Sequence, residues 1–280
     1  MRYRYSGLVV LLTLALQGCL SASQRIDAQA GAAGLSRSVV AGRDFHHVIY
    51  ANAPARSAAA AQRLIVYFDG DGRPWGSDGR QPAADPTTRK PLALQLLART
   101  PAPGIYVSRP CYQELKDPSC DTALWTAARY STAVVDSLVA AIERFPATPR
   151  EIVLIGYSGG GVLATLAAER LAHVTAVVTL AANLDIDAWA QYHGYLPLTG
   201  SLNPALSERD HAWREIHLQG ADDAVVPAAT TVRYFARYPA ARQQPFEGFS
   251  HVCCWVERWE EIFAGLEIAP TLPSPASGGG

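Results

Sequence analysis

The sequence predicts an α/β fold in which a mostly parallel central sheet is covered by helices on both faces. Short, nearly uninterrupted apolar segments alternate along the chain with segments whose apolar residues recur every three or four positions. Strands that are apolar on both faces are typical of parallel sheets buried between helices. The composition is that of a globular protein, since 49% of the 280 residues are hydrophobic and 18% are charged.

The expected strands are runs rich in β-branched, aromatic or leucine side chains, bounded by glycine, proline or polar clusters. They lie at residues 39–50, 63–69, 104–108, 151–156, 174–180, 215–218 and 244–247. The runs at 63–69 (RLIVYFD) and 151–156 (EIVLIG) contain almost no polar residue between their ends, so we expect both to be buried.

The expected helices lie between these strands. They cover residues 91–99, 122–145, 162–171, 227–237 and 254–264. In the first of them, Leu92, Leu96 and Leu97 face the core. In the longest, residues 122–145, apolar side chains recur at helical spacing until Pro146 stops the helix.

The first 18 residues are expected to be a signal peptide. Two arginines precede an apolar run at residues 8–16, which is too short to span a bilayer comfortably. The run ends in LQGC, which resembles a bacterial lipobox and implies that Cys19 is lipidated and becomes the new N-terminus. By resemblance to the sorting of Gram-negative lipoproteins, Leu20 rather than aspartate after that cysteine favours the outer over the inner membrane. The alternative is a secreted or periplasmic protein cleaved near residues 21–23.

One folded domain is expected at residues 38–266. Residues 19–37 are rich in alanine, serine, glycine and glutamine without periodicity, which predicts a lipidated tether. Residues 267–280 are expected to be a disordered tail. The segment at about 183–211 shows little clear secondary structure and is too long for a plain connection, so it is either a cap over a site or a surface excursion.

Charge and cysteine content exclude some classes of function. The 24 Lys and Arg residues and 25 Asp and Glu residues leave no basic excess for a nucleic-acid partner. Besides Cys19 the chain has four cysteines, and an even number in an exported protein predicts disulfides. Cys111 and Cys120 are the natural pair, whereas Cys253 and Cys254 could form a vicinal disulfide or stay as thiols. No spacing favours a zinc site, and no metal or cofactor is expected.

The strongest functional signal is GYSGG at residues 156–160. This G-x-S-x-G motif follows a buried strand and precedes a helix, which is the setting of a nucleophile elbow. Gly156 and Gly160 are needed because side chains there would collide with the neighbouring strand and helix. Ser158 is therefore the candidate nucleophile, and the N–H of Gly159 is a candidate oxyanion donor at the helix N-terminus.

A serine nucleophile needs a base and an acid that orients the base. The turn after the expected strand 215–218 contains the pattern D-x-x-V-P, which makes Asp223 the candidate acid and Asp222 the alternative. His251 follows the last weak strand and is the candidate base. The order serine, aspartate, histidine along the chain is that of α/β-hydrolases and differs from that of the other triad folds.

Through these ordered elements the chain resembles the α/β-hydrolase family, and in particular its small exported lipoprotein-type members, over about residues 40–265. The resemblance implies the α/β-hydrolase fold with a small cap insertion, and a second oxyanion donor in the turn after the third strand. That turn begins at Asp69, where histidine is commonest, and the N–H of Asp71 or, failing that, Gly70 is the expected donor. The alternating acids also resemble a calcium loop, but the bidentate glutamate is missing.

The leading hypothesis is a serine hydrolase, most simply a carboxylesterase or lipase-like esterase at the bacterial cell envelope. It would act on a small-molecule ester or related acyl substrate and bind the membrane through its N-terminal lipid. A substrate pocket is expected to be lined by the aromatic residues Trp75, Tyr112, Tyr157, Trp189, Tyr192 and Tyr195. His193 of the expected cap could also touch substrate, although a structural role is more typical. The same triad would serve an amidase or peptidase, and a non-catalytic binding lipoprotein on this fold is the other class.

Overall fold

The computed structural model describes residues 20–57, 62–147, 149–208, 212–266 and 268. The expected signal peptide and Cys19 therefore lie outside the described residues, as does the expected tail apart from Ile268. In the described ranges, no helix combines the length and the apolar character needed to cross a membrane.

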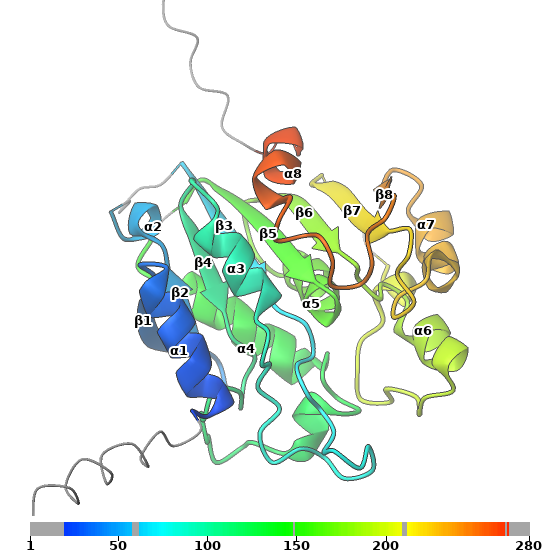
Figure 1. Ribbon diagram of the computed structural model, residues 1–280, viewed down its shortest axis with the longest axis horizontal. Coiled ribbons are helices and arrows are strands. Elements are labelled where there is room, and N and C mark those ends of the chain that lie inside the picture. The colour runs from blue at the N-terminus through cyan, green and yellow to red at the C-terminus, as the bar shows by residue number, and fades with distance from the viewer. Residues whose placement is uncertain (1–19, 58–61, 148, 209–211, 267, 269–280) are drawn as a thin grey trace, which may run out of the picture.

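An eight-stranded sheet forms the centre of the molecule, in the order β1-β2-β4-β3-β5-β6-β7-β8 (Figure 1). Its strands are β1 (Ser36–Ala41), β2 (His46–Ala51), β3 (Arg63–Phe68), β4 (Gly104–Val107), β5 (Glu151–Tyr157), β6 (Val174–Leu180), β7 (Arg214–Gly220) and β8 (Arg242–Phe246). β2 runs antiparallel to β1 and β4, and the strands from β3 to β8 are parallel. The mostly parallel sheet predicted from the sequence is confirmed.

Helices cover both faces of this sheet (Figure 1). The α-helices are α1 (Ala22–Ala32), α2 (Ala53–Ser57), α3 (Leu92–Ala98), α4 (Thr132–Glu143), α5 (Gly159–Ala168), α6 (Ile186–His193), α7 (Val232–Arg237) and α8 (Trp259–Gly265). Short 3₁₀ helices lie at Thr122–Trp125, Pro204–Leu206 and Ala228–Thr231.

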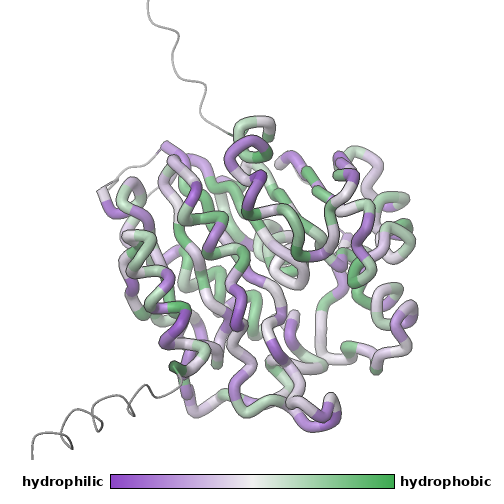
Figure 2. The backbone as a smooth tube through the Cα atoms, in the orientation of Figure 1, coloured by the Kyte–Doolittle hydropathy of each residue, from purple (hydrophilic) through white to green (hydrophobic). Residues whose placement is uncertain are grey.

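The hydrophobic core is divided by the sheet into two layers, and Figure 2 shows hydrophobic residues along the central strands. Successive residues of β3 alternate between the layers, because side chains along a strand point to opposite faces. Leu64 and Val66 join the layer that contains residues of α4 and α5. Ile65 and Tyr67 join the layer that contains residues of α1, α3 and α8. The sequence reads as continuously apolar here because both faces are covered.

The expectation of an unstructured tether at residues 19–37 is wrong, because α1 and the start of β1 lie in this segment. Ser21 begins α1 with a capping box. The Ser21 side chain accepts from the Gln24 N–H, and the Gln24 side chain accepts from the Ser21 N–H. Ile26 and Ala30, one helical turn apart, are buried against the core. A stripe this narrow among alanines and polar residues gives little periodicity, which explains why the sequence did not reveal the helix.

Other differences concern boundaries. The expected strand at 39–50 is a hairpin, with β1 and β2 paired in antiparallel fashion. The expected helix at 122–145 is divided, because the Ser131 side chain accepts from the Val134 N–H and begins α4 there. The segment at about 183–211 contains α6 and a 3₁₀ turn where the sequence showed little regular structure.

Candidate active site

Ser158 occupies a strained turn between β5 and α5. Its φ is 53° and its ψ is −127°, a backbone conformation that costs a non-glycine residue about 1–3 kcal/mol. A Cβ at Gly156 would overlap the Gly160 carbonyl, and one at Gly160 would overlap the Phe68 carbonyl. The Ser158 N–H donates to the Leu180 carbonyl at 2.8 Å, which ties the turn to β6. The two glycines and this bond together hold the serine at the carboxyl edge of the sheet.

His251 lies between Ser158 and Asp223. Its Nε2 is 3.1 Å from Ser158 Oγ, and its Nδ1 is 2.9 Å from Asp223 Oδ2. The other carboxylate oxygen of Asp223 accepts the N–H groups of Val225 and Val226, both at 2.8 Å. A carboxylate oriented in this way places the proton on Nδ1 and leaves Nε2 free to accept the serine proton.

The loops that carry the acid and the base are hydrogen-bonded to each other. The Asp222 N–H donates to the Phe249 carbonyl at 2.9 Å, so this residue contributes its backbone while Asp223 contributes its carboxylate to His251. On the base loop, the Trp255 Nε1–H donates to the His251 carbonyl at 3.0 Å. The Tyr157 ring packs against His251 with centroids 5.2 Å apart. His251 is therefore held by Tyr157 against its ring, by Trp255 at its carbonyl and by Asp223 at its Nδ1.

The turn at residues 69–72, called the oxyanion turn below, passes close to the serine. A Cβ added at Gly70 would lie 3.4 Å from the Ser158 Cβ. The Gly70 N–H donates to Asp69 Oδ1 at 2.9 Å and is occupied. The Asp71 N–H has no acceptor among the described residues. Of the two N–H groups expected from this turn, only that of Asp71 is free to act as an oxyanion donor together with the Gly159 N–H among the described residues.

The carboxylate of Asp71 is the centre of a buried charge cluster. It accepts from Arg109 Nη2 at 2.7 Å, from Arg129 Nη1 at 2.8 Å, and from the Tyr130 hydroxyl at 2.8 Å. The side chains of Arg109 and Arg129 are only 5% and 6% exposed. Burial alone would raise the pKa of Asp71, but the two guanidinium charges outweigh it and hold that pKa below its ordinary value. The turn is therefore anchored by an ionised carboxylate between two arginines.

The backbone of the oxyanion turn is held by residues 109–113, called the clamp segment below. Arg109 Nε donates to the Gly70 carbonyl at 3.2 Å, and the Tyr112 hydroxyl donates to the Asp71 carbonyl at 2.8 Å. The carbonyl oxygens of both Gly70 and Asp71 are thus bonded. The clamp segment is itself cross-linked, because Cys111 forms a disulfide with Cys120.

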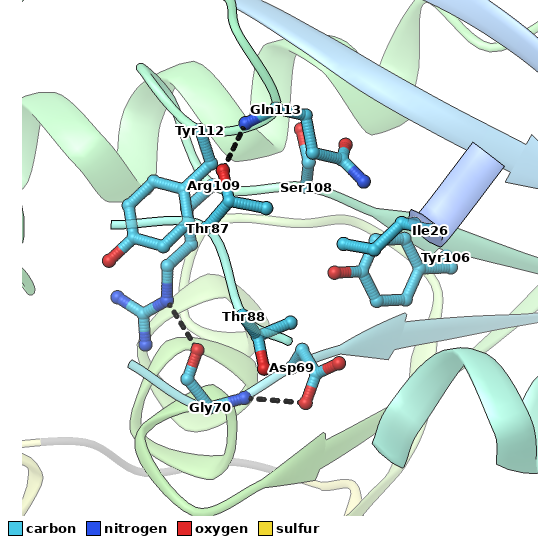
Figure 3. Close-up of a pocket in the computed structure, with 10 residues that line it drawn as sticks. All are labelled: Ile26, Asp69, Gly70, Thr87, Thr88, Tyr106, Ser108, Arg109, Tyr112 and Gln113. Carbon is cyan, nitrogen blue, oxygen red and sulfur yellow. Dashed lines mark hydrogen bonds between the residues drawn. The ribbon is translucent and has the colours of Figure 1, made fainter. Parts of the chain in front are cut away.

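A small cavity lies behind the oxyanion turn (Figure 3). Its volume is about 10 Å³, room for about one water molecule, and it is lined by residues of α1, the oxyanion turn, β4 and the clamp segment. Asp69 Oδ2 and Gln113 Oε1 are buried there and have no hydrogen-bond partner among the described residues. Burial raises the pKa of Asp69 to about 7, against the Gly70 N–H and the charge of Arg109, which lower it. Asp69 is therefore only partly ionised near neutral pH, whereas Asp71 is ionised.

The six aromatic residues expected to line a pocket lie in different environments. Tyr112 and Tyr157 are buried, the first under the oxyanion turn and the second against His251. Trp75 is 36% exposed in the loop that follows the turn. Trp189 packs partly against the core, whereas Tyr192 and Tyr195 are more than half exposed. They do not form one cluster, although the last three belong to α6 and the turn after it.

Comparisons with solved structures agree with this architecture. An esterase of Pyrococcus furiosus has a TM-score of 0.57 at 11% identity, over 83% of this chain and 90% of that one. A Xanthomonas campestris α/β serine hydrolase without a lid gives 0.54 at 14%, over 85% and 97%. An acylaminoacyl peptidase of Pyrococcus horikoshii gives 0.57 at 12%, over 83% of this chain and 41% of that one. The chain has the α/β-hydrolase fold. No family model and no curated protein sequence matches it.

Within this α/β-hydrolase fold, the sequence did not reveal the supports of the oxyanion turn. Arg109, Arg129 and Tyr130 converge on Asp71 from positions 38 to 59 residues away along the chain. No local motif marks such a cluster, because each member is an ordinary charged or aromatic residue. The only signal was the presence of an extra acid at position 71 in a turn that needs no acidic side chain.

The cysteines of this domain are paired. Cys111 and Cys120 have Cα atoms 5.7 Å apart, and Cys253 and Cys254 form a vicinal disulfide next to the base loop, across a cis peptide bond. The first bridge supports the clamp segment, so one of the two disulfides lies within the structure that positions the oxyanion turn.

Proposed function

We propose that the protein is a serine esterase that hydrolyses carboxylic esters through an acyl-enzyme. The observation that carries this proposal is the continuous chain from Asp223 through His251 to Ser158, with separations of 2.9 and 3.1 Å, at an elbow with positive φ. Nucleophile, base and orienting acid are within hydrogen-bond reach of one another, which is the geometric requirement for acyl transfer.

The chemistry follows from these positions. Ser158 Oγ attacks the ester carbonyl carbon while His251 Nε2 takes the serine proton, and Asp223 stabilises the imidazolium. When the tetrahedral intermediate collapses, the bond to the alkoxy group breaks and His251 gives its proton to the departing alcohol. Water then attacks the acyl-serine with His251 as base, and the free acid leaves as the serine regains its proton.

The charge cluster supports the oxyanion that forms in both steps. The N–H groups of Gly159 and Asp71 are the donors, and the Asp71 donor belongs to a residue held between two arginines. Two guanidinium groups around one carboxylate leave a net positive charge beside the turn. Asp69 opposes this charge only to the extent that it ionises. Fixed positive charge in a water-poor site favours the negatively charged transition state.

The structural comparisons support this class of reaction, since the similar solved proteins include an esterase and a serine hydrolase. Cleavage of an amide by the same triad is the second candidate, and the similarity to an acylaminoacyl peptidase is the observation that favours it. A panel of p-nitrophenyl esters and the matching p-nitroanilides separates the two. Activated esters are intrinsically much more reactive than anilides, so turnover of anilides at rates that approach those of the matching esters would assign the protein to the amidases.

The decisive experiment is labelling of the purified mature protein with a fluorophosphonate probe. The wild type should label, whereas Ser158→Ala and His251→Ala should not. Ser77→Ala, which removes an exposed serine elsewhere, should label like the wild type. If the folded, oxidised wild type fails to label, the enzyme proposal is wrong and the alternative of a binding lipoprotein takes its place.

We further propose that the enzyme is anchored at the bacterial outer membrane by a lipid on Cys19. The proposal rests on the lipobox-like segment LQGC and on Leu20 after it. Expression of wild type and Cys19→Ser in a Gram-negative host, followed by membrane fractionation, tests it. The wild type should sediment with outer membranes and the variant should not; a wild type found in the soluble periplasmic fraction would contradict the anchor.

A further inference from the structure

Two ring side chains of α6 bond to the turn that carries the catalytic acid. Trp189 Nε1 and His193 Nε2 each donate to the carbonyl oxygen of Val225 at 2.8 Å. The two residues are four positions apart and therefore lie on the same face of the helix. Both bonds reach one oxygen, in the turn two residues after Asp223.

The peptide unit that receives these bonds also contacts the acid. The Val225 carbonyl and the Val226 N–H belong to one planar peptide. Its carbonyl accepts from α6, while its N–H donates to Asp223 Oδ1 at 2.8 Å. Bonds to the carbonyl of a peptide fix its plane and polarise its N–H, which strengthens the bond on the other side. The ring pair and the carboxylate are thus joined through a single rigid unit.

The rings are held in place by their own neighbours. Gly194, with φ of 65°, ends α6 in a left-handed conformation that is favourable for glycine. The chain then turns back, so that Tyr195 stacks on His193 with ring centroids 5.1 Å apart and packs edge-on against Trp189 at 5.3 Å. Neither donor can rotate away without breaking these ring contacts.

The other end of α6 is fixed to the body of the domain. Asp185 caps the helix by accepting from the Ala188 N–H, and its fully buried carboxylate also forms an ion pair with Arg233. Asn203 donates to the same carboxylate at 3.0 Å. The helix is therefore attached to the domain at its beginning and to the acid turn near its end.

We propose that Trp189 and His193 are positioning residues, which set the orientation of Asp223 through the Val225–Val226 peptide. This inference rests on the proposed serine-hydrolase function. This role differs from the expectation that Trp189 lines a substrate pocket, because the ring nitrogens of Trp189 and His193 bond to the protein backbone. Neither residue is required to touch substrate.

The two roles predict different kinetics. If Trp189 and His193 position the acid, their loss lowers kcat by the same factor for every acyl chain and leaves KM unchanged. If they line a pocket, the effect falls on KM and varies with acyl length. The labelling rate with a small fluorophosphonate reports the triad with little contribution from a pocket.

The test uses variants that keep an aromatic ring but remove the donor, Trp189→Phe and His193→Phe, alone and combined. His193→Gln keeps an N–H donor near the position of Nε2 and should restore most of the lost rate. Each single variant should lose up to about tenfold in kcat and labelling rate, as expected for one hydrogen bond, and the double variant should lose more. Gln191→Ala, an exposed change on the same helix, should behave as the wild type.

A spectroscopic measurement makes the test independent of turnover. The His251 Nδ1 proton, bonded to Asp223, should give a far-downfield proton NMR resonance that moves or broadens in the double variant. Equal kcat, equal labelling and an unmoved resonance in the double variant would overturn the positioning role, as would a loss confined to KM. A wild type that does not label refutes the esterase proposal instead, and the resonance then still decides whether α6 orients the acid.

Discussion

The two sides of the active site are built from different kinds of interaction. On the triad side, glycines and backbone hydrogen bonds position Ser158 and Asp223, and the N–H groups that orient Asp223 come from its own turn. On the oxyanion side, the turn at Asp71 is held by charged and phenolic side chains from distant segments. The triad side should therefore fail chemically while remaining folded, and the oxyanion side should lose stability and activity together.

The largest effect is expected from Asp223→Asn on the triad side. An amide at this position favours the wrong imidazole tautomer, so kcat should fall on the order of 10⁴-fold. Asp222→Asn is the matched control, since Asp222 is exposed and His251 bonds to Asp223 instead, and this variant should stay within about twofold of wild type. Steady-state kinetics on one p-nitrophenyl ester measures both. Equal losses in the two variants would contradict the assignment of the acid.

The oxyanion side should respond to Asp71→Ala by losing stability. The substitution leaves the buried charges of Arg109 and Arg129 without their partner, which costs about 3–5 kcal/mol of unfolding free energy. Activity should fall as well, because the turn loses its anchor. Urea unfolding at neutral pH measures the stability, with Asp44→Ala as an exposed acid-to-alanine control. A stability equal to that of the control would mean that the cluster contributes nothing to the fold.

This comparison also explains what could be predicted from the sequence. The G-x-S-x-G elbow, the acid turn and the histidine were recognisable because each depends on a local pattern next to a strand. The parallel sheet followed from apolar runs such as residues 63–69, which are buried on both faces. The cluster around Asp71 depends on contacts between residues far apart in the chain, and α1 depends on two buried apolar side chains. Their local marks are slight: an extra acid at position 71 for the cluster, and the Ser21–Gln24 capping pair for α1.

A third effect concerns the pH dependence of stability at the oxyanion turn. The pKa of Asp69 rises from its ordinary 3.8 to about 7 because the carboxyl is buried. Between these two values the folded state binds more protons than the unfolded state, so this group lowers stability as pH increases, by at most about 1.4 kcal/mol per pH unit. Above about pH 7 the loss is complete.

Asp69→Asn removes this titration. The stability of the variant relative to wild type should therefore increase from pH 4 to pH 7 and then stay constant, as measured by urea unfolding at several pH values. Asp71 does not contribute in this window, because its pKa lies below the ordinary value. A stability difference that is independent of pH would show that Asp69 is ionised throughout.

The smallest effect is expected from removing a single tyrosine hydroxyl, and comparing two such variants separates a loss of stability from a loss of activity. Tyr112→Phe removes only the hydroxyl that donates to the Asp71 carbonyl, and Tyr67→Phe removes a buried hydroxyl bonded to Thr100 on the far side of the sheet from α4 and α5. Each should cost about 1 kcal/mol of unfolding free energy, the usual net value of one hydrogen bond.

Only Tyr112→Phe should also lower kcat, by up to about tenfold, because its bond fixes the peptide that follows the Asp71 donor. KM should change little in both variants, since neither hydroxyl is proposed to contact substrate. Equal kcat in the two variants would mean that the charge cluster alone orients the turn. A loss of kcat in Tyr112→Phe alone would show that the backbone bond from the clamp segment is needed even when Arg109 and Arg129 are in place.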